Sequence, residues 1–244
     1  MKLIPFLMPG FPSIRASHDV LLFLQTQRDV IIETALPTLQ PSGSALVQKV
    51  RKIVIRAGIK AEDVISTFRA NRKQTAMLML HTEPDGQQLS QIHASFDYAI
   101  APFDAEKVAQ LNASAATKRK NQNLATRFGA QVAPDDTDME AKVRASDGFV
   151  YLKTAAEREG DLFSENQIRG AIGKIKSIKA VEVFCGFGVK TPADVRMLKS
   201  AGADGVFLGS EALKAQEESL AQFKAFWQPI QEEAENGKQR DKNA

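Results

Sequence analysis

Eight short apolar segments recur along the chain, and most of them are nearly continuous in hydrophobic residues. Parallel strands that are buried on both faces have this pattern, whereas strands with one wet face alternate between apolar and polar residues. We therefore predict eight parallel strands, at residues 3–8, 30–33, 76–80, 98–101, 130–133, 149–152, 181–184 and 206–208.

The stretches between these segments carry helix signals. The clearest is in residues 191–202, where Thr191 is a capping residue, Pro192 takes the first helical position, Asp194 follows three residues after the cap and Gly202 ends the helix. Six further helices are predicted at residues 17–27, 45–57, 61–69, 139–146, 165–177 and 210–226.

Strand followed by helix, repeated along the chain, predicts parallel strands joined by right-handed crossovers. The count of eight strands and the length of 244 residues, close to the roughly 250 residues of a typical (β/α)8 barrel, favour a closed TIM barrel over an open doubly wound sheet. We expect one barrel domain over residues 1–229. Residues 230–244 are polar after Ala234 except for the last residue, so we expect a fraying helix end and a disordered tail there.

The composition indicates which kinds of partner and which cellular compartment to expect. The net charge is +3 with 25% charged residues, which is an ordinary surface rather than a polycation built for nucleic acid. No apolar run approaches the roughly 20 residues that cross a bilayer. The single cysteine, Cys185, excludes an intramolecular disulfide. We expect a cytoplasmic protein with neither a nucleic-acid nor a membrane partner.

Glu33 is the first candidate for chemistry, because it ends the predicted strand 30–33. In (β/α)8 barrels the reactive groups lie at the C-terminal ends of the strands. A carboxyl group among apolar neighbours there has its pKa raised by desolvation and serves as an acid or base near neutral pH. The alternative is a strand-end glutamate that faces water.

Glycines follow each of the last three predicted strands. They are Gly160, the pair Gly186 and Gly188, and Gly209, which stands before Ser210 at the start of a helix. Glycine permits close backbone approach, and amide groups at a helix start attract anions. Together they predict a phosphate site of the kind that barrels build after strands 7 and 8.

Other features predict no further site. The three histidines have no carboxylate or cysteine partners at metal-ligand spacing, so no metal site is expected, and His81 is interpreted as a solvated loop residue. The basic clusters at 49–52 and 118–120 are interpreted as solvated helix faces. Cys185 is interpreted as a small buried hydrophobe.

Five motifs carry a resemblance to a known family: IPFLMPG at 4–10, IETALP at 32–37, GFVY at 148–151, CGFGVKTPADV at 185–195 and GADGVFLGS at 202–210. The chain resembles the α subunit of tryptophan synthase, a family that splits indole-3-glycerol phosphate into indole and glyceraldehyde 3-phosphate. The resemblance extends over roughly residues 3 to 228 and is strongest after Ser146.

The resemblance implies roles for single residues. Glu33 falls on the catalytic position, Tyr151 on the active-site tyrosine and Phe6 on a position of the indole pocket. The phosphate positions are Gly160, Gly188, Gly209 and Ser210. No cofactor is implied, because the reaction of this subunit needs only side-chain acid–base chemistry and pyridoxal phosphate belongs to the β subunit. We expect a barrel without the family's helix before the first strand.

One catalytic residue of the family is missing. Its second carboxylate, an aspartate, aligns with Gly43 or Ser44, and no acid occurs in residues 38–45. Glu159, just before Gly160, takes the place of a threonine that contacts this aspartate, so we hypothesise that Glu159 supplies the acid instead.

Three functions remain open. The first is a lyase of tryptophan biosynthesis with a phosphorylated small-molecule substrate and a β subunit as a possible partner. The second is a weak or inactive barrel that binds a phosphorylated ligand or regulates a β-type partner. The third is a different phosphosugar enzyme, an isomerase or aldolase that uses Glu33.

Overall fold

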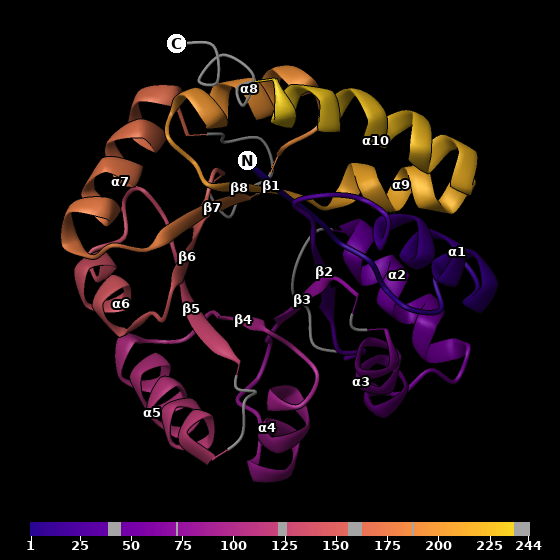
Figure 1. The fold of residues 1–244 in the computed structure, drawn as a ribbon, viewed down its shortest axis with the longest axis horizontal. Coiled ribbons are helices and arrows are strands. Elements are labelled where there is room, and N and C mark those ends of the chain that lie inside the picture. The colour runs from indigo at the N-terminus through magenta and orange to yellow at the C-terminus, as the bar shows by residue number, and fades with distance from the viewer. Residues whose placement is uncertain (39–44, 72, 122–125, 156–162, 187, 237–244) are drawn as a thin grey trace.

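The structure is a computed structural model, and it describes residues 1–38, 45–71, 73–121, 126–155, 163–186 and 188–236. Eight strands form one sheet in the order β1-β8-β7-β6-β5-β4-β3-β2, and all pairs are parallel. Backbone bonds from the Leu3 N–H to the Asp29 carbonyl (2.9 Å) and from the Leu7 N–H to the Glu33 carbonyl (2.8 Å) join the edges β1 and β2. The sheet is therefore a closed (β/α)8 barrel, as predicted (Figure 1).

All eight strands occur where the apolar segments predicted them, with ends shifted by up to three residues. They are β1 (Lys2–Pro5), β2 (Ile31–Ala35), β3 (Thr75–Met79), β4 (Tyr98–Ala101), β5 (Arg127–Val132), β6 (Phe149–Lys153), β7 (Glu182–Gly186) and β8 (Gly205–Leu208).

The helices pack around the outside of the sheet. They are α1 (Ile14–Leu24), α2 (Ala45–Arg56), α3 (Ala61–Ala70), α4 (Gly86–His93), α5 (Ala105–Asn121), α6 (Met139–Ala145), α7 (Glu165–Ile178), α8 (Pro192–Ser200), α9 (Ser210–Glu218) and α10 (Leu220–Glu235). Helices α4 and α5 were not predicted. The helix predicted at 210–226 is two helices, because Ser219 breaks α9 and caps α10, its hydroxyl accepting from the Gln222 N–H at 3.1 Å.

Helix α10 extends past residue 229, the expected end of the barrel. The helix continues to Glu235, and Ile230 and Ala234 are both buried. The reason is that these two apolar residues share the inner face of α10 with Phe223 and Trp227. Residues 237–244 lie outside the described residues.

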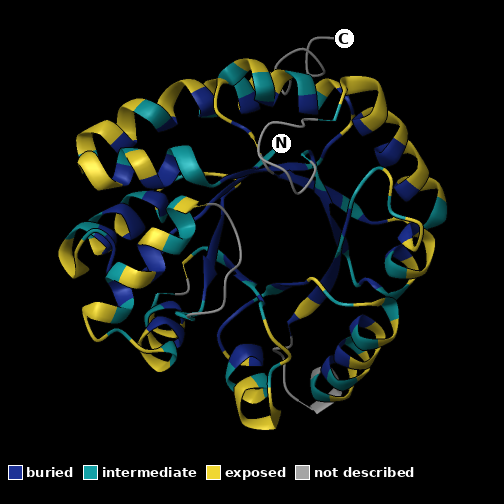
Figure 2. Ribbon diagram, turned by 180° about the vertical axis from the view of Figure 1, so that it is seen from behind, coloured by how far each residue is buried: buried dark blue, intermediate teal, exposed yellow. Residues whose placement is uncertain are grey.

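Besides a cluster beside β2 that contains Phe6, Met8, Phe11, Ala35, Val50, Val54 and Leu213, the core has two main parts. One lies between the sheet and the ring of helices, whose outer faces are exposed (Figure 2). The other fills the lumen of the barrel with side chains of Ile4, Ile31, Met77, Ile100, Phe149, Tyr151, Phe184 and Phe207. The lumen is thus packed at its lower levels, and ligand chemistry is confined to the mouth, where the C-terminal strand ends lie. In the described part of the chain, no helix is both long enough and apolar enough to cross a membrane.

Candidate active site at the mouth of the barrel

Glu33 lies near the C-terminal end of β2 and is only 7% exposed. Its neighbours Ile32 and Thr34 belong to the opposite face of the strand, so Glu33 shares the lumen face with Ile31, a member of the lumen cluster. Burial raises the pKa of the Glu33 carboxyl from its ordinary 4.5 to about 8. At neutral pH the group therefore holds its proton and is able to act as an acid, which a glutamate facing water would not do.

Tyr151 projects into the same lumen from β6. Its ring packs edge-on against Phe207, with centroids 4.5 Å apart, and the residue is 4% exposed. Burial raises the pKa of the Tyr151 hydroxyl well above its ordinary value, and the charge of Glu33 raises it further. The two groups thus interact electrostatically across the lumen, and the tyrosine is a neutral hydrogen-bonding group throughout the physiological range.

Phe6 connects the first strand with both of its neighbours. Its N–H donates to the Leu208 carbonyl at 2.9 Å, and it forms a parallel bridge with Glu33. The side chain is 6% exposed and packs with Met8, which belongs to the same cluster beside β2. Phe6 therefore stands next to Glu33 at the mouth, where it presents an aromatic ring.

Backbone groups at the ends of β7 and β8 form a candidate anion cradle. Gly188 has a φ of +80°, and Gly209 is the N-cap of α9, whose first residue is Ser210. Among the described residues, a Cβ at Gly209 would meet nothing within 4 Å, so none of them crowds this helix start. Amide groups at a helix start bear partial positive charge, and such a start accepts a phosphate.

Thr154 fixes the strand end that leads into this cradle. Its N–H and its hydroxyl both donate to the Gly186 carbonyl, at 2.7 and 2.6 Å, and the residue is 4% exposed. The position was not singled out from the sequence, because a threonine after a strand has no distinctive pattern. The hydrogen bonds tie the end of β6 to the end of β7.

Four of the positions named from the sequence lie outside the described residues. They are Gly43, Ser44, Glu159 and Gly160. The hypothesis that Glu159 replaces the missing acid therefore stays a hypothesis, as does the role of Gly160.

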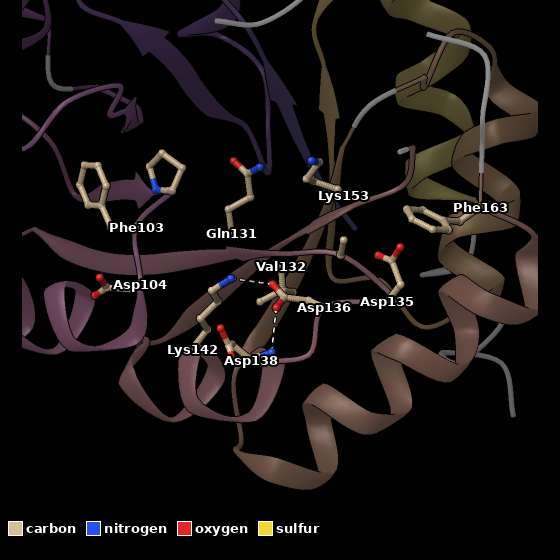
Figure 3. A pocket seen from close by; sticks show the side chains of 12 residues that line it. Phe103, Asp104, Gln131, Val132, Asp135, Asp136, Asp138, Lys142, Lys153 and Phe163 are labelled. Atoms are coloured by element: carbon tan, nitrogen blue, oxygen red, sulfur yellow. Dashed lines mark hydrogen bonds and ion pairs between the residues drawn. The ribbon is translucent and has the colours of Figure 1, made fainter. Parts of the chain in front are cut away.

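A cavity of about 530 Å³ opens beside the site, at the ends of β4, β5 and β6 (Figure 3). Glu33, Gly188 and Gly209 do not line it. The ammonium of Lys142 pairs with the Asp136 carboxylate there at 2.7 Å. The lining is formed by Pro102, Phe103, Asp104, Gln131, Val132, Ala133, Asp135, Asp136, Asp138, Lys142, Lys153 and Phe163. The signal that sequence reasoning missed is a polar residue, Gln131, inside an apolar strand.

Arg51 and His81 correct two interpretations of surface residues. Arg51, from the basic cluster on α2, is only 2% exposed, and its guanidinium contacts the His81 imidazole. Burial and the neighbouring guanidinium lower the pKa of His81 to about 4. His81 is therefore a neutral, half-buried residue after β3 rather than a solvated one. Among the described residues, no group of three His, Cys, Asp or Glu side chains is placed to hold a metal ion.

The fold and the mouth define the class of the protein: a (β/α)8 barrel with a proton-bearing carboxyl group on β2 that faces its lumen and, two strands away, the helix start that follows β8. Comparison with known families is more specific. The model of the family "Tryptophan synthase alpha chain" matches residues 99–242. The chain belongs to the tryptophan synthase alpha chain family, as its motifs indicated, and with that family it has an alpha-type function in tryptophan biosynthesis.

Curated relatives span nearly the same length. The tryptophan synthase alpha chain of Picosynechococcus sp. is 27% identical over 247 residues, covering 94% of this chain and 92% of the relative. That of Arabidopsis thaliana is 26% identical over 232 residues, covering 90% and 82%.

Solved structures agree in fold. Tryptophan synthase from M. tuberculosis superposes with a TM-score of 0.78 at 23% identity, covering 96% of this chain and 91% of that chain. The tryptophan synthase complex from Pyrococcus furiosus gives a TM-score of 0.76 at 20% identity, covering 96% and 97%. At these identities the likeness establishes the barrel.

Proposed function

We propose that the chain cleaves indole-3-glycerol phosphate into indole and glyceraldehyde 3-phosphate by a retro-aldol reaction. The observation that carries the proposal is the buried Glu33, whose pKa of about 8 keeps it protonated at neutral pH. The reaction needs an acid of this kind, because the ring carbon that bears the glycerol chain must gain a proton before the carbon–carbon bond breaks.

Glu33 alone donates and recovers the proton that the reaction needs. The carboxyl group donates its proton to C3 of the indole ring, and the carboxylate then accepts the proton of the hydroxyl on the attached glycerol carbon. The bond between the two carbons breaks, the hydroxyl carbon becomes an aldehyde, and the electron pair returns to the ring. Glu33 ends the cycle protonated, so no cofactor or metal is required.

The other named residues bind and orient the substrate in this proposal. Gly188, Gly209 and Ser210 hold the phosphate with backbone amides and the start of α9, together with Gly160. Phe6 contacts the indole ring beside Glu33. Tyr151 orients the substrate with its neutral hydroxyl.

The test is the release of indole from indole-3-glycerol phosphate by the purified chain. We expect turnover, and a loss of 10²-fold or more in kcat in Glu33→Gln, the usual size of a lost general acid. Binding of glycerol 3-phosphate, followed as a shift in the unfolding temperature, stays as in the wild type in this variant. No indole from the wild-type chain, alone or with a β-type partner, would refute the lyase.

A second candidate rests on the loop at residues 38–45, which contains no acid. A barrel without the family's second carboxylate binds the phosphorylated ligand while turning it over slowly or not at all. Stabilisation by glycerol 3-phosphate without indole release identifies this case. A gain in rate in Ser44→Asp then separates a missing carboxylate from a scaffold that is otherwise incompetent, and a loss in Glu159→Gln supports the replacement acid.

Partner, location and domain extent complete the proposal. We propose a cytoplasmic protein whose barrel mouth meets a β-type subunit. The support is family membership and the absence of any cysteine beyond Cys185, which suits a reducing compartment. The catalytic domain in this proposal is the barrel, with α10 as its last element and the residues after 236 as a tail.

A further inference from the structure

Gln131 is a polar residue on the lumen face of β5. Phe128, Ala130 and Val132 belong to the core between the sheet and the helices, so the residues between them face the lumen. Gly129 confirms this direction, because a Cβ there would lie 2.6 Å from the ring of Phe149, a member of the lumen cluster. Gln131 is the next lumen-facing residue toward the mouth.

Gln131 stands at the level of the proposed chemistry. It pairs in register with Tyr151 on the adjacent strand, and residues paired in this way lie side by side on one face of a sheet. Figure 3 shows the side chain of Gln131 on the opposite side of β5 from Lys142. Gln131 therefore shares the lumen side with Tyr151, although nothing in the proposed proton transfers uses it.

The carboxamide of Gln131 is half-buried at the wall of the 530 Å³ cavity, next to Val132 and in the same lining as Phe103. No side-chain hydrogen bond of Gln131 occurs within the part of the chain that the structure describes. An amide in this place is hydrated until a ligand displaces the water. A ligand that gives it no hydrogen bond in exchange loses affinity, because an unsatisfied buried amide is costly.

The order of the strands places Gln131 at the far end of a bound substrate. In the closed sheet, β4 lies four strands away from β8 in either direction, hence opposite to it, and β5 is the neighbour of β4 (Figure 1). A substrate held by its phosphate at Gly209 and passing between Glu33 and Tyr151 extends toward β4 and β5. Its aromatic end then meets Gln131.

We infer that Gln131 is a specificity-determining residue that forms a hydrogen bond with the aromatic end of the substrate. This inference rests on the proposed function and adds a requirement for the substrate. Its ring must carry a hydrogen-bonding group that faces β5. That group is either the ring N–H of indole or a substituent such as a hydroxyl on the six-membered ring. A ligand whose ring has only apolar atoms toward β5 binds poorly.

The test compares the wild type with Gln131→Met, which keeps the length of the side chain and removes its hydrogen bonds. Calorimetry measures the affinities for three probes that need no turnover. Glycerol 3-phosphate has the phosphate and no ring. Indole-3-propyl phosphate has the ring N–H as the only hydrogen-bonding group on its ring. The third probe is indole-3-propyl phosphate with a methyl group on the ring nitrogen and a hydroxyl on the six-membered ring.

Lys142→Met is the matched control, because Lys142 lines the same cavity from α6 on the other side of β5. We expect Gln131→Met to bind glycerol 3-phosphate as the wild type does and to bind one of the ring probes about tenfold more weakly, the size of one lost hydrogen bond. A loss with the N–H probe assigns the bond to the ring nitrogen, and a loss with the hydroxylated probe assigns it to the substituent. Lys142→Met binds all three probes as the wild type does.

The remaining outcomes overturn the inference. If Gln131→Met binds both ring probes as tightly as the wild type or more tightly, the amide is only a hydrated rim residue. If the wild type binds glycerol 3-phosphate but neither ring probe, the inference fails while the phosphate site stands. If no probe binds the wild type, the proposed function fails, and the inference with it.

Discussion

At the scale of single residues, burial decides what the ionisable groups of the mouth do. Glu33 and Tyr151 are both less than 10% exposed, and desolvation is the first cause of the raised pKa of each. His81 shows the same effect with the opposite sign, since burial of a base lowers its pKa. The Glu33 carboxyl group is thus kept protonated by its burial in the barrel.

The raised pKa of Glu33 predicts a pH dependence of stability. Between pH 4.5 and about 8 the folded chain keeps a proton that the unfolded chain has released. With respect to Glu33, the free energy of unfolding therefore has its full value below pH 4.5. It falls as the pH rises from 4.5 toward 8, by about 1.4 kcal/mol per pH unit. Between pH 5.5 and 7.5 the wild type should lose about 3 kcal/mol of unfolding free energy that Glu33→Gln does not lose.

Urea unfolding of both proteins at the two pH values measures this difference. The exposed Glu62 on α3 provides the control, because Glu62→Gln should retain the wild-type slope. Parallel stability curves for the wild type and Glu33→Gln would mean that Glu33 is ionised in the folded state, and its role as a neutral acid would then be lost as well.

Residue chemistry was only partly predictable from the sequence. Glu33 was singled out because it ends the predicted strand 30–33, and the strand end is where barrels place reactive groups; the structure places it within β2, on the lumen face and buried. Gln131 was not found, because whether a polar residue within a strand faces the lumen or the helices depends on register, which the sequence pattern of buried parallel strands does not reveal. The burial of Arg51 was missed for a similar reason, since nothing marks the face of α2 that packs inward.

At the scale of elements, the apolar segments located all eight strands, whereas helix prediction was less complete. A parallel strand buried on both faces is a dense hydrophobic signal, and it survives errors of a few residues at each end. In helix α5 the buried apolar residues Val108, Leu111 and Ala115 stand among polar and small residues, and α4 begins at Gly86, directly after the turn-like residues Pro84 and Asp85. Asp85 is nonetheless the cap of α4, its carboxylate accepting from the Gln88 N–H at 2.7 Å.

The contact between β6 and β7 yields a prediction about the site. A Cβ at Gly186 would lie 2.5 Å from Cε2 of Tyr151 and 2.6 Å from its hydroxyl oxygen, so Gly186→Ala has to displace the ring. We expect the variant to fold with a loss of roughly 1–3 kcal/mol, as for other overpacked sites, and to lose most of its kcat because Tyr151 no longer orients the substrate. Thermal unfolding and the indole-release assay measure the two effects.

Gly173→Ala on α7 is the control, because a Cβ there meets no atom of the described part of the chain within 4 Å. It should leave activity unchanged and add up to about 1 kcal/mol of stability, since alanine is the better helix former. Full activity in Gly186→Ala would show that the position of the Tyr151 ring is not required.

At the scale of the whole molecule, the last helix completes the barrel. Helix α10 packs against α8, α9 and α1, and so connects the end of the chain with its beginning. Lys199 on α8 donates to the carbonyls of Glu233 and Ala234 at 3.2 and 2.9 Å, and Arg196 pairs with the Glu233 carboxylate at 2.7 Å. Because α9 begins at the candidate anion cradle, the packing of α10 also supports the candidate site.

Two truncations test where the folded unit ends. A chain that stops at residue 229 loses the buried side chains of Ile230 and Ala234 and the bonds to Lys199, and we expect it to lose about 3 kcal/mol or more of unfolding free energy. A chain that stops at residue 236 keeps all of these contacts and should unfold like the full chain. Denaturant titration of the three proteins measures both effects, and equal stability of the 1–229 and 1–236 chains would place the end of the folded barrel before Ile230.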